Sequence, residues 1–578
     1  MVLLYCTSSG APTRSRPRPL LVPPRVVIVV RLLLFFSCAF SLAALAIVPN
    51  PLAASPAPER IAALSLPLVD VNPLGANFFL DREVELWKKE MTLGMAREAG
   101  IGWAKLLFSW EGIEPRKGYF RDDRLRRSTW EKYDDLVRLA RKYGIRVIAR
   151  LDRAPNWSRS NNTYPTAPPD NLQDYGDFVH AVVSRYKGKV QHYQIWNEPN
   201  IFPEWGDRPV DPAGYAAMLR IAYQRAKEAD PDAIVLSAPL AQTLETGPRN
   251  LNEVEYLEGI YRAGGREHFD LLLANAYGFD RPPSDPPDPQ VLNFARLRLL
   301  RDVMERHGDG GKAVWINEYG WNASPPDFPL DKLPWRRVTE EEQARYTVEG
   351  IRLARSWGWV GVVNVWYFRQ VGDLLPMDRS DYYFRLVDVD FVPRLPYFAL
   401  QQFADTLRVS GPGLVEEANP AVDWEGDWAL RLNRRASGGT VLSSSTVGDR
   451  LRLTFQGTGV TLVHPRSPQG GRLWAALDGH VIPTLPQDES GRSVLDLFAP
   501  GEEWEVRTPL ASGLQPGRHT LELAVAPSSR PLAEPTATVD AFEIFWERQA
   551  IVQFVFFSLL ALVSAALLAS TFLMLRWR

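Results

Sequence analysis

Cysteine, histidine and excess charge of either sign are scarce in this chain of 578 residues. Its two cysteines, Cys6 and Cys38, both precede the region that we expect to fold, so that region has neither disulfides nor thiol chemistry. The seven histidines show no spacing typical of a metal site, and we expect no catalytic metal and no cofactor. The net charge of −2, from 66 basic and 68 acidic side chains, gives no indication of nucleic-acid binding.

Long apolar segments lie near both ends of the sequence. Residues 26–48 are apolar except for Arg31 and small polar side chains, and residues 551–575 form a second apolar run. Each segment is long enough to span a membrane. Basic residues flank these segments on their outer sides: Arg14, Arg16, Arg18, Arg25, Arg576 and Arg578. The positive-inside rule then predicts a protein of the cell membrane, with both termini in the cytoplasm and the region between them on the extracytoplasmic side.

The first apolar segment has two interpretations. Ala44-Leu45-Ala46 fits the small-residue signal at which a signal peptide is cleaved, so this segment is either a signal-anchor or a signal peptide. We expect residues 1–48 to form a cytoplasmic tail plus that segment, and residues 49–65 to form a Pro- and Ala-rich stalk. In both cases residues 551–575 form a transmembrane helix that tethers the protein.

Between residues 66 and 408, apolar runs that resemble strands alternate with amphipathic helical stretches. The predicted strands are residues 74–79, 103–108, 146–151, 190–196, 233–237, 271–276, 313–316 and 361–366. Helices are predicted over residues 83–99, 131–143, 172–186, 215–229 and 340–356, where apolar side chains recur at helical spacing. Eight strands that alternate with helices favour a (β/α)8 TIM barrel over an open doubly wound sheet.

Beyond residue 408 the pattern changes to short alternating runs separated by Gly, Asp and Pro. Strands are predicted over residues 450–455, 460–464, 473–477, 519–525 and 539–545, without a long helix. This pattern is typical of a β-sandwich, and we expect a jelly-roll-like one over residues 409–546. It is a candidate carbohydrate-binding domain.

Two short segments each carry a glutamate directly behind an asparagine in aromatic surroundings. Trp196-Asn197-Glu198-Pro199 ends the fourth predicted strand, and Asn317-Glu318-Tyr319 follows the seventh. In a barrel the ends of different strands meet at one face and build the active site there. Hydrolysis of a glycosidic bond needs two carboxyl groups, one to donate a proton and one to attack the sugar or activate water. The pattern indicates Glu198 and Glu318 as that pair; the alternative is two structural carboxylates paired with arginines.

Residues 70–405 resemble the retaining glycoside hydrolases of clan A, most closely family 39-like enzymes such as xylosidases and bacterial exopolysaccharide glycosidases. The strongest match is Arg185-Tyr186-Lys187-Gly188-Lys189-Val190, which leads into Trp196-Asn197-Glu198-Pro199. The resemblance implies that Glu198 is the acid/base, that Glu318 is the nucleophile, and that Asn197 holds the 2-hydroxyl of the substrate. The C-terminal sandwich looks like the non-catalytic domain of some of these enzymes.

Two positions depart from the family pattern. Lys105 stands where an arginine is usual on the second strand, near the nucleophile; lysine keeps the charge but lacks the bidentate fork. Asn275-Ala276-Tyr277 stands where a His-x-Tyr pattern is common, so Asn275 alters a polar contact while Tyr277 can still hydrogen-bond a carboxylate. Because both glutamates are retained, we expect altered specificity rather than an inactive protein.

The expected substrate is a poly- or oligosaccharide outside the cytoplasm. Trp366, Trp321 and Trp157 are candidate flat surfaces for binding sugar rings, although ordinary loop packing is an alternative for Trp157. In a retaining enzyme the two carboxyl groups should lie about 5–5.5 Å apart. Two alternatives remain for the activity: a transglycosylase with the same covalent intermediate, and a non-catalytic polysaccharide-binding protein on a barrel scaffold.

Overall fold

The computed structural model describes residues 66–160, 164–531 and 534–546. The predicted tail and first apolar segment, the stalk, and the transmembrane helix at residues 551–575 lie outside the described residues. Within the described part of the chain, no helix is both long and apolar enough to cross a membrane.

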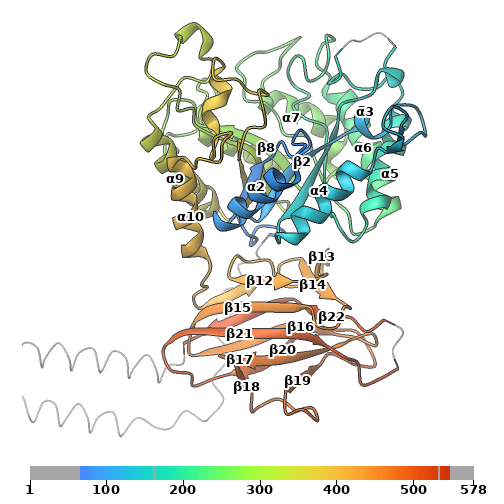
Figure 1. The fold of residues 1–578 in the computed structure, drawn as a ribbon, viewed down its shortest axis with the longest axis vertical. Coiled ribbons are helices and arrows are strands. Elements are labelled where there is room, and N and C mark those ends of the chain that lie inside the picture. The colour runs from blue at the N-terminus through green and yellow to red at the C-terminus, as the bar shows by residue number, and fades with distance from the viewer. Residues whose placement is uncertain (1–65, 161–163, 532–533, 547–578) are drawn as a thin grey trace, which may run out of the picture. The chain divides into compact units, whose positions relative to one another are not determined.

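Eight parallel strands form the N-terminal sheet (Figure 1). In sheet order they are β7 (Ile234–Leu236), β6 (His192–Ile195), β5 (Arg146–Asp152), β2 (Trp103–Ser109), β1 (Leu74–Asn77), β10 (Val360–Val365), β9 (Val314–Gly320) and β8 (Leu272–Tyr277). A parallel bridge between Leu236 and Leu271 joins the two edges of the sheet. The sheet therefore closes into a barrel, and the eight predicted strands are confirmed.

Helices alternate with these strands and surround the barrel (Figure 1). They are α2 (Leu86–Glu98), α3 (Trp110–Ile113), α4 (Glu131–Lys142), α5 (Leu172–Tyr186), α6 (Pro212–Ala229), α7 (Glu253–Arg262), α8 (Leu297–Arg306), α9 (Glu340–Ser356) and α10 (Leu395–Leu407). In α4 the buried side chains Tyr133, Leu136 and Ala140 recur at helical spacing, so one face of the helix packs on the core. Five 3-10 helices and a short hairpin complete this part: η1 (Asn156–Ser158), η2 (Gly265–His268), η3 (Phe294–Arg296), η4 (Leu330–Lys332), η5 (Ser380–Phe384), β3 (Arg121–Asp122) and β4 (Arg127–Ser128).

Strand β9 is longer than the sequence predicts and includes Glu318. Its register with β8 pairs Ala274 with Ile316 but Asn275 with Glu318, so Asn317 is the extra residue of a bulge. A bulge bends a strand and changes the direction in which the following side chains point. The expectation that Glu318 follows the seventh strand was wrong: the residue lies inside that strand, just behind the bulge.

Antiparallel sheets form the C-terminal part. One contains, in order, β11 (Gly413–Glu416), β23 (Ala541–Phe545), β16 (Gly459–Arg466) and β20 (Glu503–Ala511). A second contains β12 (Val422–Glu425), β15 (Arg450–Gly457), β21 (Gly517–Ala526), β17 (Arg472–Leu477) and β18 (His480–Val481), with β19 (Ser493–Asp496) also on β17. A third contains β13 (Ala429–Leu432), β14 (Thr440–Ser444) and β22 (Ala537–Val539).

Side chains from different sheets of this part share one buried cluster, as in a β-sandwich. The cluster includes Leu453 and Phe455 of β15 together with Leu462 of β16 and Phe542 of β23. The single strand predicted over residues 539–545 is in fact the end of β22 and the whole of β23, with Asp540 between them. The jelly-roll-like connectivity and the binding of carbohydrate by this domain stay predictions.

Candidate active site

Glu198 lies in a sharp turn directly behind β6. Trp196 and Glu198 have φ angles of 70° and 39°, in the left-handed region that few non-glycine residues adopt. Hydrogen bonds hold the turn: Gln194 Nε2 donates to the Trp196 carbonyl at 2.8 Å, and the Glu198 amide donates to the Pro239 carbonyl at 3.1 Å. Strained backbone of this kind persists where the surroundings fix it, often at functional sites.

Glu318 is held from two sides by donors on two other strands of the barrel. Lys105 Nζ, from β2, donates to Oε1 at 3.0 Å, and the Tyr277 hydroxyl, from β8, donates to Oε2 at 2.8 Å. All three side chains are buried, with exposed fractions of 4–5%. A cation and a hydroxyl donor on separate oxygens both favour the ionised carboxylate. Lys105 therefore makes the contact with the proposed nucleophile despite the departure from arginine.

The environment of Glu198 favours the opposite protonation state. Burial raises the pKa of Glu198 to about 8, and the charge of Glu318 adds to this shift. Asn275 Nδ2 donates to Glu198 Oε1 at 2.5 Å, which favours the ionised form and partly opposes the shift. The two carboxyl groups thus differ in their surroundings: Glu318 is paired with a cation and a hydroxyl donor, whereas the pKa of Glu198 is raised. In two-carboxylate sites, different surroundings distinguish the acid from the nucleophile.

The two asparagine–glutamate segments are connected through Asn275. Asn317 Nδ2 donates to Asn275 Oδ1 at 3.1 Å, so the amide next to Glu318 orients the amide that contacts Glu198. Asn77 Nδ2 in turn donates to the Asn317 carbonyl at 3.0 Å. Asn197 is buried and accepts a hydrogen bond from Gln194 Nε2 at 3.4 Å; its contact with a substrate hydroxyl stays a prediction.

A charged group that the sequence analysis missed interacts with Glu318. Arg150 Nε donates to Asp152 Oδ2 at 2.6 Å near the end of β5. Burial lowers the pKa of Arg150, but the negative charges of Asp152, Glu204 and Glu318 outweigh that effect and raise it. Burial also raises the pKa of Glu204, against the opposing charge of Arg150. The signal was present in the sequence, because charged residues interrupt the otherwise buried run of β5.

Trp366 directly follows β10 and remains partly exposed. Its backbone amide donates to the Tyr319 carbonyl at 2.8 Å, and its ring meets Phe79 edge-on at 5.8 Å. It packs against an aromatic cluster that contains Tyr277. Trp335, which the sequence analysis did not single out, lies 4.6 Å from the Tyr277 ring in the same cluster. The role of Trp366 as a surface for a sugar ring stays a prediction.

Two other tryptophans that were predicted to bind sugar rings make packing contacts in the barrel. Trp321 is fully buried, its Nε1 donates to the Arg281 carbonyl at 2.7 Å, and its ring covers Gly278 so closely that an added Cβ would lie 1.9 Å away. It is a core residue, and the prediction of substrate contact was wrong. Trp157 packs edge-on against Trp110 at 5.6 Å and donates to the Glu114 carbonyl, which favours the loop-packing alternative.

Comparisons with known proteins found similarity among solved structures only. The sequence matches no family model, and no curated protein matches it. One similar structure is a family 39 glycoside hydrolase from Bacteroides cellulosilyticus, with 20% identity, a TM-score of 0.44, and coverage of 81% of this chain and 83% of the other. Another is a monomeric β-xylosidase from Caulobacter crescentus, with 15% identity, a TM-score of 0.43, and coverage of 79% and 97%.

A family 39 enzyme from Xanthomonas axonopodis is similar at 14% identity and a TM-score of 0.43, over 83% of this chain and all of the other. At such identities and TM-scores, likeness alone carries no conclusion about the activity of this chain. Two of these three solved structures are family 39 enzymes and the third is a β-xylosidase.

Proposed function

We propose that this protein is a retaining glycoside hydrolase that uses Glu318 as nucleophile and Glu198 as acid/base. One observation carries the proposal: the two glutamates have opposite environments. Lys105 Nζ and the Tyr277 hydroxyl stabilise Glu318 as a carboxylate, whereas burial and the charge of Glu318 raise the pKa of Glu198 to about 8. A double displacement requires this division of roles.

In the first step, the Glu318 carboxylate attacks the anomeric carbon and forms a glycosyl ester. The bond to the leaving oxygen breaks, and Glu198 donates its proton to that oxygen. Once Glu318 is esterified its negative charge is gone, so one of the causes that raise the pKa of Glu198 is removed. Glu198 is then better suited to the second step, in which it accepts a proton from water.

In the second step, that water attacks the anomeric carbon from the side the leaving group left, and the ester bond to Glu318 breaks. Both displacements invert the anomeric centre, so the product keeps the configuration of the substrate. Lys105 Nζ and the Tyr277 hydroxyl then donate hydrogen bonds to the free Glu318 carboxylate again. If a sugar hydroxyl takes the place of water, the same residues perform transglycosylation.

Substitution of each glutamate tests the proposal. On a panel of aryl glycosides and polysaccharides, Glu318→Gln should lose essentially all activity that the wild type shows. Glu198→Ala should retain activity only on substrates with good leaving groups, and added azide should restore it with a glycosyl azide of retained configuration. Glu267→Gln, an exposed carboxylate of the same domain, is the control and should behave like the wild type. Full activity in Glu318→Gln, or an inverted product, would overturn the assignment.

We also propose that the catalytic domain is held at the cell membrane on the extracytoplasmic side. Support comes from the sequence: the two apolar segments, and the arginines that flank them on their outer sides. An enzyme tethered in this way would act on glycans close to the membrane, such as a nascent exopolysaccharide. Protease added to intact spheroplasts should digest the barrel and spare a tag at the C-terminus; cleavage of the tag with a protected barrel would contradict this orientation.

A further inference from the structure

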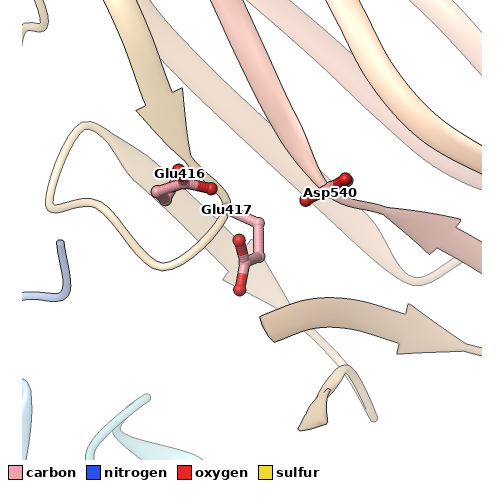
Figure 2. A group of neighbouring side chains, drawn as sticks. All are labelled: Glu416, Glu417 and Asp540. Carbon is pink, nitrogen blue, oxygen red and sulfur yellow. The ribbon is translucent and has the colours of Figure 1, made fainter. Parts of the chain in front are cut away.

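Three carboxylates meet in the C-terminal sandwich, in a part of the molecule that glycoside hydrolysis does not use. Glu416 ends β11, Glu417 follows it, and Asp540 lies between β22 and β23. The antiparallel register places Glu416 opposite Ala541, which brings these distant parts of the sequence together. One carboxylate oxygen of each residue lies within 4.8 Å of the other two (Figure 2).

Glu417 is the residue that requires an explanation. Its side chain is fully buried, and neither carboxylate oxygen has a hydrogen-bond partner within the described residues. Burial raises the pKa of Glu417 and the nearby Thr440 side chain lowers it, but Thr440 makes no hydrogen bond of ordinary geometry with either carboxylate oxygen. In the part of the chain that the structure describes, neither Glu417 nor Asp540 forms an ion pair with a basic side chain. A buried carboxylate without a partner is strongly destabilised.

The other two carboxylates are oriented by the loop that follows β13. Ser437 donates its amide to Asp540 Oδ1 at 3.0 Å and its hydroxyl to Glu416 Oε2 at 2.8 Å. Gly438 lies so close that an added Cβ would be 2.6 Å from the Glu416 carboxyl carbon. The Ser437 donors and the close Gly438 hold Glu416 and Asp540 in place, yet none of these groups donates a hydrogen bond to the Glu417 carboxylate.

We propose that Glu416, Glu417 and Asp540 bind one Ca²⁺ ion, which links the end of β11 to the junction of β22 and β23. Oxygens bound to one Ca²⁺ at 2.3–2.6 Å lie at most about 5 Å apart, which the three carboxylates satisfy. Their oxygens are hard ligands, and the group has no histidine or cysteine that would favour zinc. Main-chain carbonyls or water would fill the remaining positions of the six to eight that Ca²⁺ takes.

Without a cation, the same cluster would have to take up protons. Burial raises the pKa of Glu417 well above its ordinary value and that of Asp540 to about 6. Protonation is the competing explanation of the cluster, and it predicts no response to calcium.

Calcium binding to the full-length protein in detergent separates the two explanations. After treatment with a chelator, the wild type should bind one Ca²⁺ per chain in a titration calorimeter, and its Tm should rise by several degrees when Ca²⁺ is added. Glu417→Gln and Asp540→Asn should lose the calcium-dependent shift, while the exposed Glu489→Gln, the matched control, should keep it.

In the presence of chelator, Glu417→Gln should be at least as stable as the wild type, because the wild type must either bury the Glu417 carboxylate without a cation or take up a proton, and the variant does neither. The proposal is overturned if the wild type neither binds Ca²⁺ nor shifts its Tm. It is also overturned if both cluster variants keep the full shift. The calcium titration of the wild type tests the proposal even if a variant fails to fold.

Discussion

Removal of the Asn275 side-chain donor should shift the pH at which the enzyme loses activity. Asn275 Nδ2 donates to Glu198 Oε1 at 2.5 Å and stabilises the carboxylate form of the acid/base. Burial and the charge of Glu318 raise the pKa of Glu198 to about 8 even with this hydrogen bond in place. Asn275→Ala removes this hydrogen bond, which lowers the pKa of Glu198, so that pKa should rise further.

The size of the shift follows from the strength of that hydrogen bond. A hydrogen bond to a charged group contributes roughly 1.5–3 kcal/mol, and one pH unit corresponds to about 1.4 kcal/mol. The protonated acid also gains from the amide donor, so only part of this energy separates the two forms. We expect the pKa of Glu198 to rise by about one unit, to about 9.

The assay is the pH dependence of kcat/KM, which reports the free enzyme. Glu198 donates a proton in the first step, so activity should fall as the pH rises through its pKa: near pH 8 in the wild type and about one unit higher in Asn275→Ala. Asn156→Ala removes an exposed asparagine side chain and should leave the profile unchanged. A basic limb that stays in place or moves to lower pH in Asn275→Ala would refute the reasoning.

Other contacts of the site give further predictions. Lys105→Met leaves the Glu318 carboxylate buried without its cation and should lower the free energy of unfolding by about 3–5 kcal/mol in urea titrations, whereas Lys105→Arg, which keeps the charge, should lose less. Tyr277→Phe removes the donor to Glu318 Oε2 and should reduce kcat/KM roughly 10- to 150-fold with little loss of stability; an unchanged kcat/KM would remove Tyr277 from the mechanism. Gly278→Ala places a Cβ 1.9 Å from the Trp321 ring. It should lower the free energy of unfolding by at least the cost of about 1–3 kcal/mol typical of overpacking, and this loss should appear as a lower Tm.

The barrel could be predicted because its strands are continuous apolar runs bounded by turn residues. All eight were found, and the glutamate pair was recognised because each residue stands at or near a strand end beside an asparagine. The sequence did not indicate the bulge at Asn317, which extends β9 through Glu318. That bulge depends on hydrogen bonds from Asn77 and to Asn275, which are distant in the sequence.

Aromatic residues were the least predictable part of the site. Trp321 and Trp366 both follow a barrel strand, yet one is fully buried and the other partly exposed. What separates them is the close contact of Trp321 with Gly278, which no local pattern indicates. The Arg150–Asp152 pair was missed although its charges interrupt the apolar run of β5; the interaction of Arg150 with Glu318 is seen only in the folded barrel.

Identification of the residue that becomes glycosylated tests the central claim most directly. An aryl 2-deoxy-2-fluoroglycoside with a good leaving group slows hydrolysis of the covalent intermediate and allows it to accumulate. After inactivation and proteolysis, mass spectrometry should find the fluoroglycosyl group on Glu318, and the Glu318→Gln variant should remain unlabelled. A label on Glu198 or on another residue, or hydrolysis with inversion and no covalent intermediate, would contradict the account.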